Sequence, residues 1–160
     1  ISFGLDYGEC FALLGVNGAG KSTTFKSLTR DIVPSSGEIS IAGYNVLNEF
    51  GEARKLIGYC PQHDAIFPLM TCAEHLRFYA VIKGVPANRR QDIVEDCINQ
   101  LNLSEHRDKP AGTLSGGNKR KLSVAIAIIG NPPIILLDEP SAGMDPEARR
   151  FMWSVVEKIS

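Results

Sequence analysis

The residues with the clearest chemistry are the consecutive positions Gly15 to Ser22, which read GVNGAGKS. They fit the pattern G-x-x-x-x-G-K-[ST], in which a glycine-rich turn directs backbone N–H groups at phosphate oxygens. Gly18 and Gly20 place no Cβ atom in the turn, Lys21 supplies a compact positive charge, and the Ser22 hydroxyl can bind Mg²⁺. The spacing therefore predicts a site for a nucleoside triphosphate. A glycine-rich turn that only closes a strand–helix unit is the alternative interpretation.

Such a loop requires a strand before it and a helix after it, and the sequence supplies candidates for both. The apolar run 11–14 (FALL) is short enough for a buried strand, and residues 23–28 are typical of the first turns of a helix. A helix that begins at the loop would direct the positive end of its dipole at the phosphates. We therefore predict a strand–loop–helix unit, the context in which this loop binds nucleotides.

A second group of chemical residues follows the apolar run Ile134–Leu137, which predicts a central parallel strand. This strand would deliver Asp138 to the carboxyl edge of the sheet, where ligands of open α/β folds bind. Asp138 is a candidate to hold Mg²⁺, directly or through water. Glu139 projects in another direction and is a candidate to orient and deprotonate an attacking water. An ordinary strand end is the alternative interpretation.

Residues Leu114 to Asn118 (LSGGN) place a hydroxyl and two glycines at a predicted helix start. This is a second anion site, built like the first but without a lysine. One nucleotide rarely needs two such sites from one chain, so the second is predicted to complete the nucleotide pocket of a facing domain. An ordinary serine N-cap is the alternative interpretation.

Periodicity and turn residues divide the rest of the chain into the elements that would position these groups. Asp145 and Pro146 open the last helix as its N-cap and first residue. One earlier helix is apolar on nearly all sides, which predicts burial on more than one side. The predicted elements are strands over 37–43 and 56–60, a helix from a capping box at Thr71 to Gly84, and helices over 90–101 and 119–129.

Composition bounds the function classes. A chain of 160 residues with 44% hydrophobic residues can bury one substantial core, and a net charge of −1 gives no footprint for nucleic acid. The four cysteines show no C-x-x-C spacing, which favours reduced thiols over a disulfide framework. No apolar run approaches the roughly 18 residues of a membrane span. The chain opens in a strand-like pattern and stops within an amphipathic helix, so we expect part of a larger domain.

The motifs in this order resemble the nucleotide-binding domain of ABC-type ATPases, with Leu114 to Asn118 matching the family signature. Residues 58–62 (GYCPQ) match the Q-loop, and residues 143–145 (GMD) match the D-loop, which meets its twin across a dimer. The individual residues of the motifs, including SGGNKRKLS over 115–123, are similar to those of subfamily A, the lipid exporters. They most resemble the second nucleotide-binding domain of those transporters. The family signature usually ends in Gln, and Asn118 is common in subfamily A.

This resemblance implies an α/β fold of the ABC type, with a mostly parallel sheet and an antiparallel patch around residues 37–46. Residues 1–69 and 130–160 are expected to form the ATP-binding core, and residues 70–129 an inserted helical subdomain that carries the signature. It also implies Mg-dependent ATP hydrolysis that drives transport, with lipid as the expected cargo. The chain alone should bind ATP weakly and hydrolyse it poorly.

The resemblance further implies roles for individual residues. Glu139 and Gln62 are the expected catalytic residues, and Ser22, Gln62 and Asp138 are expected to hold Mg²⁺. Nucleotide contacts are expected from Gly15, Asn17, Gly18, Ala19, Gly20, Lys21, Ser22 and Thr23, and, across the dimer, from Ser115, Gly116 and Gly117.

Partners are implied as well: a second nucleotide-binding domain packed head to tail, and transmembrane domains that hold this domain on the cytosolic side of a membrane, with no nucleic acid. A soluble ABC ATPase in translation or DNA repair is the alternative function, and a non-hydrolysing regulatory module is a further one. The family's adenine-stacking aromatic and switch histidine are expected outside residues 1–160. We expect His63, His75 and His106 on loops or helix surfaces, and the cluster 119–121 (KRK) as a solvated helix start.

Overall fold

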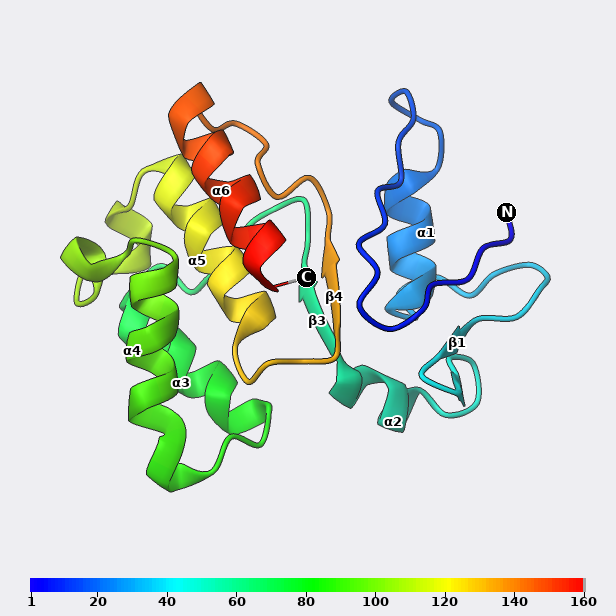
Figure 1. Ribbon diagram of the computed structural model, residues 1–160, viewed down its shortest axis with the longest axis horizontal. Coiled ribbons are helices and arrows are strands. Elements are labelled where there is room, and N and C mark those ends of the chain that lie inside the picture. Colours follow the sequence, from blue (N-terminus) through cyan, green and yellow to red (C-terminus); the bar gives the residue numbers. More distant parts are fainter. Residues whose placement is uncertain (160) are drawn as a thin grey trace.

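The computed structural model describes residues 1–159, and its helices pack around a small parallel pair of strands (Figure 1). Short 3-10 turns connect several of the helices. In chain order the elements are α1 (Lys21–Leu28), β1 (Ser40–Ile41), β2 (Tyr44–Asn45), α2 (Phe50–Ala53), β3 (Ile57–Cys60), α3 (Cys72–Ile82), α4 (Arg90–Gln100), α5 (Gly116–Ile128), β4 (Ile134–Leu137) and α6 (Pro146–Ile159).

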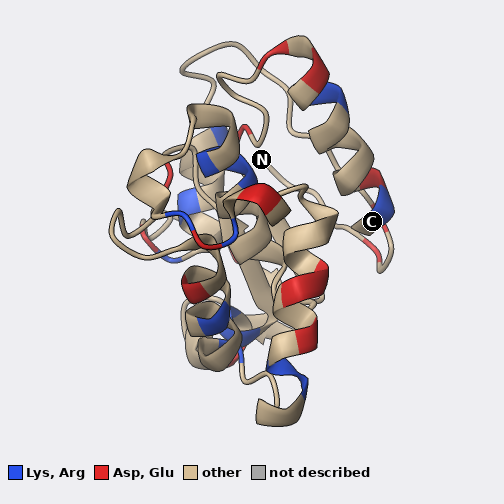
Figure 2. Ribbon diagram, turned by 90° about the vertical axis from the view of Figure 1, so that its left-hand side faces the viewer, with Lys and Arg blue, Asp and Glu red and all other residues tan. Residues whose placement is uncertain are grey.

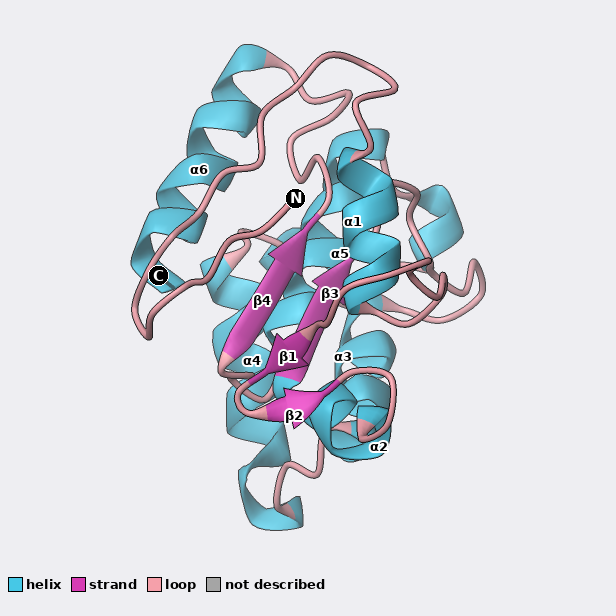
Figure 3. Ribbon diagram, turned by 90° about the vertical axis from the view of Figure 1, so that its right-hand side faces the viewer, coloured by secondary structure: helices cyan, strands magenta, loops and turns pink. Residues whose placement is uncertain are grey.

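The parallel pair of β3 and β4 is the frame on which the candidate site is built. Ile57 pairs with Ile134 and Cys60 with Leu137, and the ladder continues where the Asp138 N–H donates to the Cys60 carbonyl at 2.9 Å. Figure 3 shows the two strands side by side, with helices behind them. Because the strands are parallel, the loops that follow them leave from the same edge. Both predicted strands are confirmed, but within residues 1–159 β4 pairs only with β3 and is not the central strand that was predicted.

The strand predicted over residues 11–14 is wrong. Residues 1–16 form no strand among the described part of the chain, and Leu14 is 88% exposed. A strand exists only where a neighbouring strand forms hydrogen bonds with it, and neither of the two described strand pairs includes a residue of this segment. The apolar run alone therefore did not determine the local structure.

The antiparallel patch predicted around residues 37–46 is confirmed as the hairpin of β1 and β2. Its turn residues, Ala42 and Gly43, both have positive φ (49° and 86°), as a tight two-residue hairpin turn requires. The strand is shorter than the predicted range 37–43, because Gly37 bends the chain with a φ of 91° and Gly43 lies in the turn.

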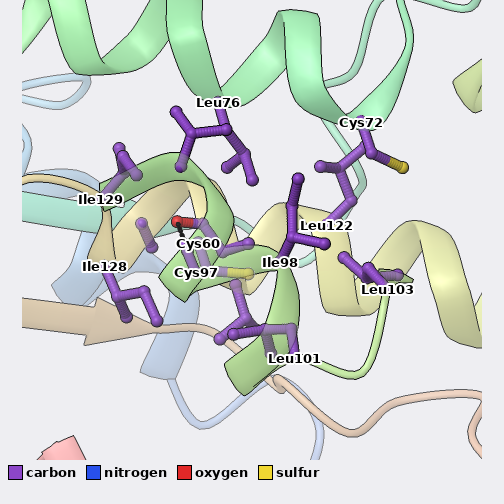
Figure 4. Packing of buried hydrophobic residues seen from close by; sticks show 14 of the residues in the cluster. Cys60, Cys72, Leu76, Cys97, Ile98, Leu101, Leu103, Leu122, Ile128 and Ile129 are labelled. Atoms are coloured by element: carbon purple, nitrogen blue, oxygen red, sulfur yellow. Dashed lines mark hydrogen bonds between the residues drawn. The ribbon is translucent and has the colours of Figure 1, made fainter. Parts of the chain in front are cut away.

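The main core lies between the helices α3, α4 and α5 and the face of the β3–β4 pair. Figure 4 shows Leu76, Ile98 and Leu122 meeting there, and each is at most 1% exposed. The helix α5 packs against both strands and against α3 and α4. Its burial on several sides confirms the prediction from its apolar composition.

The helix ends follow the capping residues. Thr71 and Glu74 form the predicted capping box, and Gly84 follows the end of α3 with a φ of 73°. The Asp145 carboxylate accepts bonds from the N–H groups of Glu147 and Ala148 at 3.0 Å, which caps α6 as predicted. Helix α5 begins at Gly116, earlier than the predicted Lys119.

Charges of both signs are interspersed over the face shown in Figure 2, as the net charge of −1 leads one to expect. Within residues 1–159, no helix has both the length and the hydropathy to cross a membrane.

Candidate functional site

The loop before α1 has the backbone shape that its glycines predict. Gly18 and Gly20 have φ values of 85° and 93°, in the left-handed region where a side chain is strained. Helix α1 then begins at Lys21. The N–H groups of Lys21, Ser22 and Thr23 lie in its first turn, where no preceding helical carbonyl can accept them. The loop therefore presents a group of free backbone donors at a helix start.

The Lys21 side chain lies back across this loop. Its Nζ donates to the carbonyls of Gly15 at 2.7 Å and Val16 at 3.1 Å. The first turn of α1 contains no acidic residue, so nothing there offsets the positive end of the helix dipole. The neighbouring Val16 is 80% exposed, which leaves the loop accessible from outside. A polyanion can therefore reach the ammonium and the N–H groups together.

The carboxyl edge of the β3–β4 pair carries the acidic residues. Asp138 directly follows β4 and is 4% exposed, and within residues 1–159 no hydrogen bond or ion pair goes to its carboxylate. Burial and then the Asp138 charge raise the pKa of Tyr59 on the adjacent strand. Asp138 thus presents an unshared negative charge near the end of the pair.

These residues fit a Mg²⁺ ion. Among residues 1–159 there is no group of three or more His, Cys, Asp or Glu side chains that could hold a metal alone. Mg²⁺ is usually held by one or two carboxylates together with substrate phosphates and waters, and a buried Asp138 whose carboxylate has no protein partner within residues 1–159 suits such an ion. Ser22, the second residue of α1, could add its hydroxyl.

Glu139 and Gln62 meet although they lie 77 positions apart in the sequence. The Gln62 Nε2 group donates to Glu139 Oε2 at 3.4 Å, between the loops that follow β3 and β4. Glu139 has a φ of 51°, a strained conformation for a residue with a side chain. The structure therefore brings together the two residues that were predicted to be catalytic.

The second predicted anion site lies at the start of α5. Ser115 is the N-cap, and its hydroxyl accepts from the Asn118 N–H at 3.3 Å. No hydrogen bond or ion pair in residues 1–159 joins Ser115, Gly116 or Gly117 to the loop before α1. Figure 1 shows α1 and α5 on opposite sides of the β3–β4 pair. The two predicted anion sites are thus separate within one chain.

Two expectations about side chains are wrong. Arg120 is 3% exposed rather than solvated, and it donates to main-chain carbonyls of the loops after β3 and β4. His75 is fully buried rather than on a surface; its Nδ1 lies 2.8 Å from the Thr71 carbonyl and its Nε2 accepts from the Phe67 N–H at 2.9 Å. Helical spacing could have placed Arg120, because Ser123 and Val124 lie on the same face of α5 and are buried.

The other two histidines and the cysteines are distributed as follows. His63 is exposed, and the Nε2 of His106 lies 2.8 Å from the Asn118 amide nitrogen. All four cysteines are free thiols, as predicted. Burial raises the pKa of Cys60 to about 11 and that of Cys97 to about 12, so neither is a reactive group.

Several known proteins are similar to this chain. A family model described as "ABC transporter" matches residues 1–142. The chain is 54% identical over 156 residues to the human retinal-specific phospholipid-transporting ATPase ABCA4, and 51% identical over 154 residues to ATP-binding cassette sub-family A member 7 of the mouse. These alignments cover 98% and 96% of the chain but 7% of the length of each relative.

Solved structures show the same fold. An ATP-binding subunit of an ABC transporter matches with a TM-score of 0.81 and 29% identity, over 91% of this chain and 61% of that one. A dimer of the ATP-binding cassette MJ0796, in a post-hydrolysis state bound to ADP and Pi, matches with a TM-score of 0.80 and 25% identity, over 90% of this chain and 66% of that one. The α/β fold predicted from the motifs is confirmed.

Proposed function

The chain belongs to the ABC transporter family, and from this membership we propose that it binds MgATP and hydrolyses it to drive transport across a membrane. The observation that carries the proposal is the contact between Gln62 and Glu139 at the edge where Asp138 ends its strand. A carboxylate and an amide that meet at a strand edge, in a chain that also carries a phosphate-binding motif, are the groups that phosphoryl transfer to water requires.

In the proposed reaction the chain holds the triphosphate and activates a water. The loop N–H groups and Lys21 bind the phosphates, in a network to which Gly15, Asn17 and Ala19 contribute the turn. Ser22 and Asp138 would hold Mg²⁺, which neutralises phosphate charge when bound. Glu139 accepts a proton from a water that Gln62 orients, and the attack on the γ-phosphorus breaks the bond to ADP.

We propose that the second anion site serves another copy of this domain. Ser115, Gly116 and Gly117 would contact the γ-phosphate bound to the partner domain, packed head to tail. The placement of α1 and α5 on opposite sides of the β3–β4 pair supports this division of the two sites between two domains. The MJ0796 relative is itself described as a dimer.

We further propose that this domain docks on transmembrane domains and that the cargo is a phospholipid. Relatives at 54% identity and 51% identity are a phospholipid-transporting ATPase and a sub-family A member, which supports the lipid class. Exposed apolar side chains near α3 offer a docking surface, and the rings of Phe67 and Phe78 lie edge to face at 6.0 Å within it. The surface consists of Phe67, Leu69, Phe78, Val81 and Ile82.

The substitution Glu139→Gln tests the function. In the assembled ATPase it should lower the steady-state hydrolysis rate by about 100-fold or more while MgATP binding stays within about twofold, because only the proton acceptor is lost. Radioactive phosphate release and fluorescent nucleotide binding measure the two quantities. Lys21→Ala is the matched control and should abolish binding itself. Rapid turnover by the Glu139→Gln variant would refute the assignment of the base.

A further inference from the structure

Arg120 lies between the loop after β3 and the loop after β4, with 3% of its surface exposed. On the side of β3, its Nη1 donates to the carbonyl of Pro61 and, at 3.3 Å, to the carbonyl of Gln62. It therefore holds the main chain of the residue whose side chain contacts Glu139.

On the side of β4, the same guanidinium holds the following loop. Its Nη2 donates to the carbonyls of Asp138 and, at 2.8 Å, of Glu139, and its Nε donates to the Pro140 carbonyl at 3.3 Å. The Arg120 fork thus uses each of its nitrogens on main-chain oxygens of the two loops. The two loops are far apart in the sequence, and the Arg120 guanidinium joins them.

A second polar group from α5 strengthens this attachment. The Ser123 hydroxyl, one turn after Arg120, donates to Asp64 Oδ1 at 2.8 Å, and Arg120 Nη1 lies 3.5 Å from the same oxygen. The start of α5 is therefore bound to the segment that continues from Gln62. Since Ser115 is the N-cap of the same helix, any displacement of the second anion site is carried toward both loops.

We propose that Arg120 is a positioning residue for hydrolysis: it holds Gln62 and Glu139 in their mutual geometry and links them to the helix that carries the second anion site. This inference rests on the proposed function, because it assigns a role within that site. Arg120 acts through main-chain carbonyls and touches no reacting atom. It should therefore govern the rate of hydrolysis and not the binding of nucleotide.

The first test separates kcat from binding in the assembled ATPase. Arg120→Met should lower kcat by about 10- to 100-fold, as losses of supporting groups behind catalytic residues do, while the Kd for MgATP stays within about twofold. Lys119→Met is the matched control, because it removes a cation from the same turn of α5. The Lys119 side chain makes no hydrogen bond within residues 1–159. Its kcat and Kd should equal those of the wild type.

A double-mutant cycle with Gln62→Ala tests the coupling itself. Gln62→Ala should lower kcat in the wild-type background but change it by less than about twofold in the Arg120→Met background, because the glutamine is already displaced. Losses that multiply in the double variant would overturn the proposal, as would an Arg120→Met variant with a wild-type kcat. Arg120 and Gln62 would then act independently.

Arg120→Lys keeps the test decisive if Arg120→Met does not fold. Lysine retains the charge near Asp64 but has no planar fork, so it cannot satisfy both loops at once. Its kcat should also fall, by about 10-fold, with MgATP binding retained as proof of a folded site. A lysine variant with full kcat would overturn the proposal. A wild-type assembly that hydrolyses no ATP would instead refute the proposed function. The two failures are distinguishable, because only the first leaves the wild-type ATPase active.

Discussion

Glu139 combines the proposed proton acceptor with a backbone conformation that side chains disfavour. Its φ of 51° lies in the left-handed region, where a residue with a Cβ atom costs about 1 kcal/mol or more relative to glycine. The carbonyls of Asp138 and Glu139, both held by Arg120, keep the chain in this shape. The strain is thus located at the residue that is proposed to accept the proton.

The pair Glu139→Gly and Glu139→Ala measures that strain. Both substitutions remove the carboxylate and should abolish hydrolysis alike, but only glycine relieves the positive φ. The glycine variant should be more stable than the alanine variant by about 1 kcal/mol, measured by urea unfolding monitored by circular dichroism. Equal stabilities would mean that the left-handed conformation at Glu139 carries no cost.

At the scale of elements, Gly58 lets β3 and α5 approach each other closely. A Cβ atom built at Gly58 would lie 1.9 Å from the Ala127 carbonyl oxygen and 2.7 Å from Pro132 Cγ. Both distances are too short for any contact, and the nearer obstacle, the Ala127 carbonyl oxygen, belongs to the backbone. Gly58→Ala should therefore cost about 3 kcal/mol or more in unfolding free energy, because strand and helix must separate.

Gly51→Ala is the control for that substitution. A Cβ atom at Gly51, in the helix α2, would meet nothing within 4 Å, so alanine should leave stability unchanged or raise it by up to about 1 kcal/mol. Urea titrations of both variants provide the comparison. A Gly58→Ala variant as stable as Gly51→Ala would contradict the close packing of β3 on α5.

The elements differ in how far the sequence could predict them. Capping residues and periodicity predicted α3, α4 and α6, because these signals act within a few residues of the helix ends. The strand predicted from the apolar run 11–14 was wrong, because a strand depends on a distant neighbour that local composition does not encode. For the site, spacing placed Asp138 and Glu139 at one edge, whereas the role of Arg120 depends on carbonyls from two distant loops.

At the scale of the whole molecule, stability should fall in alkali because of buried thiols. Burial raises the pKa of Cys60 from 9.0 to about 11 and that of Cys97 to about 12. The stability that these two thiols contribute is fully present below pH 9, their pKa in the unfolded chain. It is lost as the pH rises toward their raised pKa values in the folded protein. The pKa of Tyr59 is also raised by burial, so Tyr59 acts in the same direction. Burial lowers the pKa of Lys83, which has the opposite effect on stability.

Urea unfolding between pH 8 and pH 10.5 checks this expectation. Each thiol should reduce the free energy of unfolding by up to about 1.4 kcal/mol per pH unit above the unfolded pKa. The double variant Cys60→Ala, Cys97→Ala should show a much shallower decline, whatever its absolute stability. An unchanged slope in that variant would show that other groups govern the alkaline limb.

The short parallel pair has a consequence for handling the protein. Within residues 1–159, β3 and β4 each pair along one edge only, and their sequences, IGYC and IILL, contain neither charge nor proline. Unpaired edges of this kind offer main-chain donors and acceptors to any extended peptide. Samples of this chain should therefore self-associate as concentration rises, through strand addition along β4, whose residues are half-buried whereas those of β3 are mostly buried.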